Sequence, residues 1–361
     1  MSHHHAFALF QLYAVIINIP ICIFWAGGLE RVSAIVTETP PLSLFLIILF
    51  SFVWGFGTLF FGIACKVAGV GIGTNLSMGI IAIIGTFLPL ITENTLFTSF
   101  GAVICVGLAI CCAGLWLATK ALVKKDLDDA LVSAQDCNET DNDVDTSELD
   151  NSKNEKDIEQ NVTKPKARTF STIHKVIICL ITGVTAVQLQ FAFIFGEPVT
   201  DLAEGEIEGV NLPGKTPLGG SAGIIWLLAI SLGAPASIIN GLWSSPVPLS
   251  HSLRAPWWRH LRLVATTSIP WVCHIHLYGL TTTSLFPENM AASVAWPLLM
   301  MITNLWALLL SKILGEWKNA GSDTIRLFVY SVCITMVGLL VLMASVFIPT
   351  NKTNATILAA D

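Results

Sequence analysis

The chain has 361 residues, of which 53% are hydrophobic and only 12% are charged. Soluble globular domains carry about 25% charged residues, so this composition predicts a chain that lies in a lipid bilayer. The net charge is −6, and the basic residues form no organised patch of the kind that binds nucleic acid, which excludes that class of partner.

Nine apolar runs are long enough to cross a bilayer. The hydrocarbon core is about 30 Å thick, and a helix needs about 20 apolar residues to cross it. Lipid offers the backbone no hydrogen bonds, so helices are the expected structure and the fold class is an all-α membrane protein. The first run is too long for a signal peptide and eight more follow it. The runs cover residues 6–28, 42–65, 69–91, 98–119, 174–196, 220–243, 262–284, 291–313 and 325–348.

Basic residues predict the orientation of these spans, because loops on the cytoplasmic side carry the excess of Lys and Arg. If the chain starts in the cytoplasm, all but three of the 19 basic residues fall on that side. The exceptions are Arg31, Lys215 and Lys352. We therefore predict a cytoplasmic N-terminus and an outer tail at 351–361.

A polar segment divides the chain into two membrane parts. Residues 120–173 are rich in Asp, Glu, Asn and Ser, and the stretch 126–159 has no aromatic residue, a composition typical of disorder. We predict a disordered acidic cytoplasmic linker between a first bundle of four helices, 1–119, and a second of five, 174–350. A solvated tether is the simplest role of this linker, and a regulatory or partner-binding role stays open.

Two motifs that would indicate cofactors are rejected on their context. Residues 209–216 match the phosphate-binding pattern GxxxxGK[ST], which works only between a buried strand and a helix. Here acidic residues precede the match and Pro217 follows it. Residues 141–152 begin like a calcium-binding EF-hand loop, but Thr146 and Ser152 stand where glycine and glutamate are required. With no Cys or His cluster at zinc spacing, no cofactor or metal is predicted.

Glycine-rich and aromatic segments recur across the membrane parts. They are Trp54-Gly55-Phe56-Gly57 through Gly62, Gly69-Val70-Gly71-Ile72-Gly73, Gly85-Thr86 with Pro89, Trp271 with Tyr278, and Glu316-Trp317-Lys318-Asn319-Ala320-Gly321. In combination they resemble the bacterial L-rhamnose–proton symporter family of the drug/metabolite transporter superfamily. The resemblance covers most of the membrane region, but not the linker or the loop after the fifth span.

This resemblance implies ten helices built as two inverted repeats of five, which move a sugar with a proton by alternating access. Inverted repeats place their site at the repeat interface near the middle of the membrane. The chain departs from this pattern because its first half has four predicted spans, and the resemblance begins at the family's second helix. Either the first helix is encoded upstream of Met1 or the chain is a truncated form.

Ionisable residues inside spans are candidate functional residues, because burying them in lipid costs several kcal/mol unless they are paired. His274 and His276 lie in the seventh span, on different helix faces. Within the resemblance His274 stands where a glutamine is usual, which implies a hydrogen bond to the substrate. Histidine titrates near neutral pH, so both are candidates to exchange the coupled proton, as is Glu197 at the outer end of the fifth span. The alternatives are a neutral histidine bonded to a helix carbonyl and an exposed carboxylate at a loop end.

A bound sugar needs amide groups for hydrogen bonds and aromatic faces for stacking. The candidate substrate-binding residues are Trp54, Asn75, Gln188, Gln190, Asn240, Trp271, Tyr278 and Asn304. Tryptophans near span ends serve instead as interface anchors, and Trp257 and Trp258 are assigned to that role.

The sequence therefore predicts a multi-pass secondary transporter that couples sugar uptake to protons. One alternative is a drug/metabolite-type carrier of another small polar solute, such as a nucleotide sugar or an amino acid. The other is a non-transporting membrane scaffold or sensor. An enzyme is not predicted, because the sequence has no HExxH motif and no pair of intramembrane carboxylates.

Overall fold

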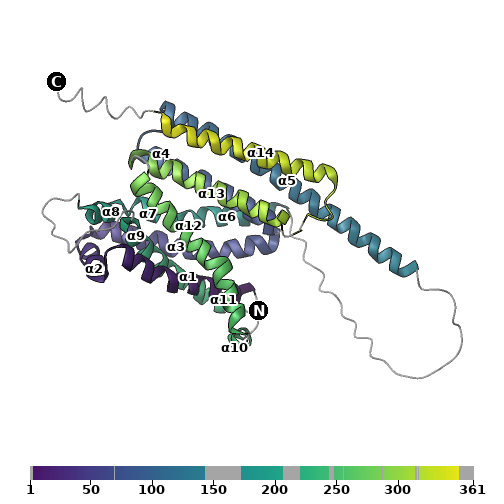
Figure 1. Ribbon diagram of the computed structural model, residues 1–361, viewed down its shortest axis with the longest axis horizontal. Helices are drawn as coiled ribbons and strands as arrows, with labels where there is room; N and C mark the ends of the chain where they lie inside the picture. Colours follow the sequence, from purple (N-terminus) through teal and green to yellow (C-terminus); the bar gives the residue numbers. More distant parts are fainter. Residues whose placement is uncertain are drawn as a thin grey trace.

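In the computed structural model, long helices lie side by side along most of the molecule (Figure 1). It describes residues 3–68, 70–142, 172–205, 220–243, 248–254, 256–285, 288–313, 315 and 317–348, and these form helices and turns with no strand. Eight helices within these residues are long and apolar enough to cross a membrane. The prediction of an all-α membrane protein is confirmed at that level.

The helices fall into two halves along the chain. The first half contains α1 (His3–Trp25), α2 (Leu29–Glu38), α3 (Pro41–Ala68), α4 (Val70–Thr92) and α5 (Ser99–Asn142). The second contains α6 (Thr172–Ala186), α7 (Gln188–Ile194), α8 (Glu197–Glu204), α9 (Gly220–Trp243), α10 (Leu249–Leu253), α11 (Trp257–Leu263), α12 (Ile269–Leu280), α13 (Glu288–Ile313) and α14 (Ser322–Ala344). Two π-helical segments, η1 (Val264–Ser268) and η2 (Thr281–Leu285), flank α12, and a 3-10 turn, η3 (Ser345–Phe347), follows α14.

The predicted span 262–284 is not one of the eight membrane-spanning candidates. It is helical, but it is divided among α11, η1, α12 and η2, and α12 itself has only 12 residues. A run of apolar residues does not reveal a π segment, because the run reports hydropathy and not the hydrogen-bonding pattern.

Helix α5 is longer than predicted. The linker was expected to begin at residue 120, but α5 continues to Asn142. Ala121 and Leu122 belong to a buried cluster with Trp317 and Phe328, and helix-favouring residues continue beyond the membrane. Residues 120–142 of the predicted linker are thus helical, while residues 143–171 lie outside the described residues.

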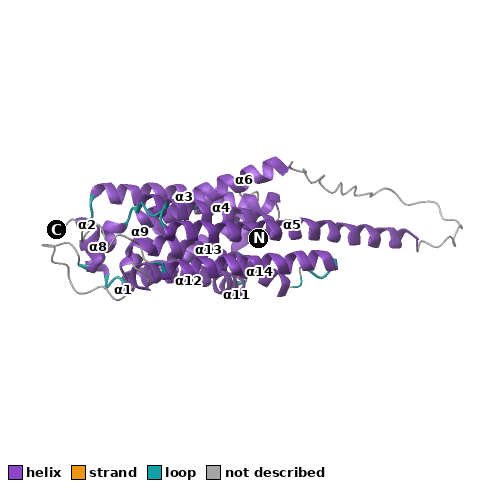
Figure 2. Ribbon diagram, turned by 90° about the horizontal axis from the view of Figure 1, so that it is seen from above, coloured by secondary structure: helices purple, strands orange, loops and turns teal. Residues whose placement is uncertain are grey.

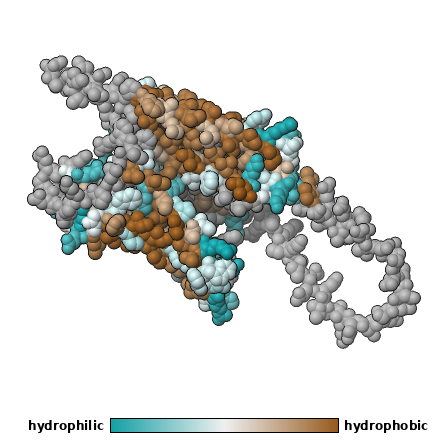
Figure 3. Space-filling model, in the orientation of Figure 1, coloured by the Kyte–Doolittle hydropathy of each residue, from teal (hydrophilic) through white to brown (hydrophobic). Residues whose placement is uncertain are grey.

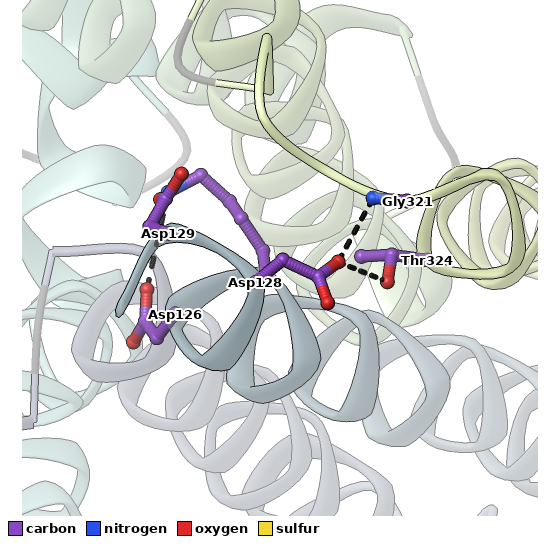
Figure 4. A network of polar contacts seen from close by, with 6 residues as sticks. Asp126, Asp128, Asp129, Gly321 and Thr324 are labelled. Carbon is purple, nitrogen blue, oxygen red and sulfur yellow. Dashed lines mark hydrogen bonds and ion pairs between the residues drawn. The ribbon is translucent and has the colours of Figure 1, made fainter. Parts of the chain in front are cut away.

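Asp128 joins this extension of α5 to the beginning of α14. Its Oδ2 accepts hydrogen bonds from the backbone N–H of Gly321 at 2.9 Å and from the Thr324 hydroxyl at 2.8 Å (Figure 4). Gly321 precedes α14 and has no side chain with which to cap it, so Asp128 caps the helix from another element. Asp128 lies beyond the apolar stretch 98–119, and the Gly321 N–H, followed by the Thr324 hydroxyl, lowers the pKa of its carboxyl.

The two halves interleave and do not form separate bundles. The most extensive packing joins α5 to α14, while α1 and α3 both pack along α9. In addition, α3 packs on α6 and α4 packs on α13. The segments 1–119 and 174–350 are thus consecutive parts of the chain, but they share one helical body.

Hydrophilic residues gather at the ends of the helices. Figure 3 shows hydrophobic residues over the middle of one face and hydrophilic ones toward its ends. The extension of α5 and the short α10 and α11 lie toward one end of the molecule, while α2 and α8 lie at the other (Figures 1 and 2). Arg254, Arg259 and Lys124 therefore lie toward the opposite end from Arg31 of α2. This arrangement agrees with alternating spans, and the cytoplasmic assignment of the basic end stays a prediction.

Two glycines let α3 and α9 approach closely. A Cβ atom on Gly55 would overlap the carbonyl oxygen of Gly233, and one on Gly233 would overlap the carbonyl oxygen of Ser51. Small residues favour such contacts in lipid, where helix association depends on close packing. This crossing holds the first half against the second.

We expect Gly55→Ala to destabilise the fold by about 1–3 kcal/mol, because the added methyl group overpacks this crossing. Gly62→Ala is the matched control on the same helix, since nothing lies within 4 Å of a Cβ there. It should be neutral or gain about 0.5–1 kcal/mol from helix propensity. Thermal unfolding in detergent measures both variants, and equal midpoints would contradict the close crossing.

Candidate functional site

Helix α12 makes polar or aromatic contacts with five other helices. Four of its side chains carry these contacts: Trp271, His274, His276 and Tyr278. We call these four side chains and their direct partners the α12 cluster. The partners are Phe10, Asn18, Cys22, Trp25, Trp54, Gln190, Phe193, Trp226, Trp296 and Thr303.

Tyr278 lies in a box of aromatic rings. Its hydroxyl donates a hydrogen bond to Oε1 of Gln190 on α7 at 2.7 Å, and both side chains are buried. Its ring centroid lies 5.2 Å from that of Phe193, 5.9 Å from that of Trp226 and 5.4 Å from that of Trp296. The phenol is therefore fixed both by a hydrogen bond and by edge contacts between rings, which favours one orientation.

Trp296 connects this aromatic box to the first half. Its indole N–H donates to the backbone oxygen of Ile81 on α4 at 3.1 Å. Gly85, one turn further along α4, leaves room for the indole, because a Cβ there would overlap Nε1 of Trp296. The glycine noted in the sequence thus positions a ring of the cluster.

His276 faces α1. Its Nε2 lies 3.1 Å from Oδ1 of Asn18, whose Nδ2 donates to the backbone oxygen of Trp226 at 3.3 Å. Because Asn18 presents its oxygen, Nε2 of His276 carries the proton of this bond. The Cys22 thiol lies 3.7 Å from the same nitrogen, and Trp25 stacks on the imidazole with centroids 5.4 Å apart. These contacts hold the His276 ring on several sides.

His274 faces α13 and keeps one nitrogen without a partner. Its Nδ1 lies 3.3 Å from the hydroxyl oxygen of Thr303. That hydroxyl donates its proton to the backbone oxygen of Leu299 at 2.8 Å, so it accepts from Nδ1–H. Nε2 of the neutral ring is then a free lone pair, buried and with no hydrogen-bond partner in the protein. The two histidines face different helices, as their spacing predicts.

Trp271 and Trp54 bring α3 to the cluster. Their rings stack with centroids 5.9 Å apart and an angle of 9° between planes. Phe10 of α1 meets Trp271 edge-on at 5.8 Å. Aromatic pairs of this kind contribute about 0.5–1.5 kcal/mol beyond the area that they bury. Trp54 and Trp271, both predicted as substrate-binding residues, therefore lie in direct contact.

Three polar atoms of the cluster are buried without a hydrogen-bond partner in the protein. They are Nε2 of Gln190, Nε1 of Trp226 and Nε2 of His274. Leaving a buried polar group unpaired costs about 1–3 kcal/mol. Two N–H donors and a lone pair therefore remain available for hydrogen bonds beside these aromatic rings.

Helix α12 is irregular at both ends. The π segments η1 and η2 flank it, and Pro270 stands in its first turn. In η2 the hydroxyls of Thr281 and Thr283 donate to the carbonyls of Leu277 and Gly279, four residues earlier. Such hydroxyl bonds satisfy carbonyls where the helix deviates, which lets an irregular helix persist at membrane depth. Single-turn π segments occur often at functional sites.

Three predicted site residues lie outside the cluster. Gln188 donates to the backbone oxygen of Val184 in the preceding helix turn. Glu197 is exposed in the first turn of α8, and Asn240 lies half-buried near the end of α9. Gln188 bonds within its own stretch of helix, so the structure does not bring its amide together with the histidines.

Asn75 and Asn304 form a second level of buried amides. They lie on α4 and α13, which pack together in opposite directions. The indole of Trp296 bonds to the backbone of Ile81. Asn75 precedes Ile81 by six residues on α4, and Asn304 follows Trp296 by eight residues on α13. At 1.5 Å per residue, both lie roughly 10 Å from the Trp296 contact. Both amide atoms of Asn75 and Nδ2 of Asn304 lack a partner in the protein.

Sequence reasoning missed Asn18 and its neighbours on α1. Asn18 follows Gln11 by seven residues and precedes Cys22 by four, which places all three on one helix face. Each is buried. Two amides at this spacing inside an apolar run were the available signal, because unpaired amides are costly in lipid.

A serine-hydrolase pattern is also present. Residues 219–223 read Gly-Gly-Ser-Ala-Gly, which matches GxSxG. The pattern is functional where a strand turns sharply into a helix. Ser221 instead lies in the first turn of α9, and its hydroxyl donates to Oε1 of Glu204 at 2.7 Å. A hydroxyl bonded to a carboxylate in this setting is a structural contact between α8 and α9.

Comparison with protein-family models, curated proteins and solved structures finds no match to this chain. The resemblance to the rhamnose–proton symporter family therefore stays a prediction that rests on the motifs given above. The function has to be argued from the α12 cluster.

We expect Gln190→Leu to destabilise the protein by about 1–3 kcal/mol, because the buried Tyr278 hydroxyl loses its acceptor. Gln188→Leu is the matched control, two residues away on the same helix, and should stay within about 0.5 kcal/mol of the parent. Thermal unfolding in detergent compares the two. A larger effect at residue 188 would contradict the assignment of the buried amide.

Proposed function

We propose that this chain is a secondary transporter that moves a neutral polar solute, a sugar in the first place, by alternating access. The observation that carries the proposal is the α12 cluster, where helices from both halves meet. There, buried hydrogen-bonding groups without partners lie among aromatic rings. Sugars present hydroxyl groups to such donors and acceptors, and their C–H faces stack on indole rings.

The charge of the cluster favours a neutral solute. Among the described residues, Arg31 is the one Asp, Glu, Lys or Arg side chain that is buried, and it lies on α2. Its guanidinium donates to the backbone oxygen of Ala203 at 2.7 Å. A nucleotide sugar carries phosphates and an amino acid carries two charges, and recognition of either uses charged partners. This argument ranks a sugar above the alternative solutes.

The pairing of helices supports an inverted repeat. Counted back from the last helix of each half, α5 pairs with α14 and α4 with α13. Each pair joins helices that occupy the same place in their half and run in opposite directions. This is the arrangement expected when two inverted repeats place a site at their interface. The cluster adjoins the α4–α13 pair through Trp296, whose indole bonds to Ile81, which fits a site where the two halves meet.

His274 is the preferred candidate for proton coupling. The lone pair of its Nε2 can take a proton and has no partner in the protein, whereas the His276 ring is held in place by Asn18, Cys22 and Trp25. No buried carboxylate occurs among the described residues, so a histidine is the ionisable side chain available for proton exchange in this cluster. Glu197 is exposed at a helix start and is not needed for this role.

Uptake by proteoliposomes tests the proposed function. We expect labelled L-rhamnose or another neutral sugar to accumulate, and to do so faster when the outside is acidic. Gln190→Leu should reduce uptake, while Gln188→Leu should leave it unchanged. Uptake of a charged solute alone would contradict the preference for sugars, and no uptake of any solute would favour the scaffold alternative.

His274→Gln should retain sugar binding but lose the dependence of uptake on the pH gradient, because the titrating nitrogen is replaced by an amide. His276→Gln is the control and should keep the pH profile of the parent. Uptake rates across a range of external pH measure both. An unchanged profile for His274→Gln would refute the coupling role.

A further inference from the structure

Helix α5 presents a continuous exposed stripe that runs out of the membrane. Within the apolar part it consists of Ala102, Val106, Ala109, Ala113 and Trp116, all exposed. Beyond this part it continues through Lys120, Val123 and Leu127. The spacing alternates between three and four residues throughout, so every member lies on one face.

The outer part of the stripe is unexpected in water. Val123 is 46% exposed and Leu127 61%, and Leu131, one turn beyond the stripe, is 66% exposed. Charged side chains lie among them, at Lys120, Lys124, Lys125, Asp126, Asp128 and Asp129, so this stretch is not in hydrocarbon. Apolar residues on lipid-facing helices need no explanation, but a row of them on a helix in water marks an interaction surface.

The opposite side of the same extension is already occupied. Ala121 and Leu122 pack in the cluster with Trp317 and Phe328, and Asp128 binds Gly321. Lys125 forms an ion pair with Asp129 at 2.9 Å along the helix. The extension is thus fixed to α14 on one side, as Figure 4 shows, and presents the stripe on the other.

We propose that a second copy of this chain covers the stripe, with the two α5 helices side by side and parallel about a twofold axis. A partner that covers both parts must cross the membrane beside α5 and continue into water for several turns. The chain's own α5 has that length and that pattern. Ala109 and Ala113 are small residues four apart, which lets two helices approach closely in lipid.

The geometry of the stripe fits a parallel pair of helices. From Ala102 to Leu127 it extends over roughly 38 Å at 1.5 Å per residue. Lys120 is its one charged member, and its ammonium lies 3.6 Å from the centroid of the Trp116 ring. A single lysine at such a seam position lowers stability but sets register and the number of strands. In a twofold dimer the same surface of each copy forms the contact, so the assembly stops at two copies.

The segment that follows α5 is a poor alternative occupant. Residues 143–171 are dominated by Asp, Glu, Asn, Ser and Lys, with few apolar residues to match the stripe. That segment also offers no apolar run for the part between Ala102 and Trp116. A second α5 covers both parts with one surface, and the inference does not depend on the proposed transport activity.

Photocrosslinking of the full chain in membranes at low protein-to-lipid ratio tests this. The photoreactive residue p-benzoylphenylalanine replaces Leu127, or Val132 on the other side of the helix as control. We expect a covalent product of twice the chain mass from position 127 only, with α5 peptides on both sides of the link. Products within one chain, products with another protein alone, or equal yields at both positions would overturn the proposal.

A substitution gives a second test. Val123→Glu combined with Leu127→Glu should weaken dimerisation roughly tenfold, because each substitution replaces an apolar side chain of the stripe with a charge that faces the same charge in the second copy. Val132→Glu is the control. Single-molecule photobleaching of labelled chains in nanodiscs counts copies per particle. A parent that is monomeric, or a dimer fraction unchanged by the double substitution, would refute the proposed contact.

Discussion

Leaving a buried polar side chain without a partner is costly, so the hydrogen bonds that such side chains form constrain which helices pack together. Helix α12 carries two histidines and a tyrosine within residues 274–278, and Trp271 lies about one helical turn before them. Its partners come from different helices: Asn18 from α1, Gln190 from α7 and Thr303 from α13. Each bond sets the rotation of the helix that supplies it. The arrangement of the helices around α12 therefore follows from satisfying these groups.

The same constraint explains why α12 can be irregular. A π segment leaves carbonyl groups without their usual helical partners, which is costly in lipid. Here the hydroxyls of Thr266, Thr281 and Thr283 donate to carbonyls of the preceding turn. A threonine-rich sequence on each side of α12 thus permits departures from α-helical geometry at membrane depth.

Hydropathy was sufficient to predict the class of fold and the location of most spans, because crossing a bilayer requires long apolar helices whatever their packing. It could not predict the π segments around α12, which depend on hydrogen bonding, or the continuation of α5 to Asn142. Its first turn contacts Trp317 and Phe328, which are far away in the sequence. Trp54, Gln190, Trp271, His274, His276 and Tyr278 were predicted as site residues and lie in the α12 cluster. The sequence could not distinguish Gln188 from Gln190, because both are glutamines in the same apolar run. They differ in the face of the helix on which they lie: Gln190 reaches Tyr278, and Gln188 bonds to Val184.

The interleaved packing limits how such a protein could alternate between two open states. Two separate bundles could rock as rigid bodies, but here α3 lies against α6 and α9, and α5 against α14, across the two halves. The crossing at Gly55 and Gly233 leaves no space for sliding without loss of contact. Helix α12 packs less extensively on its neighbours, and its contacts are hydrogen bonds and ring edges that can be exchanged for those of a solute. If the chain transports by alternating access, the change falls on α12 and its π-helical ends, while the α5–α14 pair remains fixed.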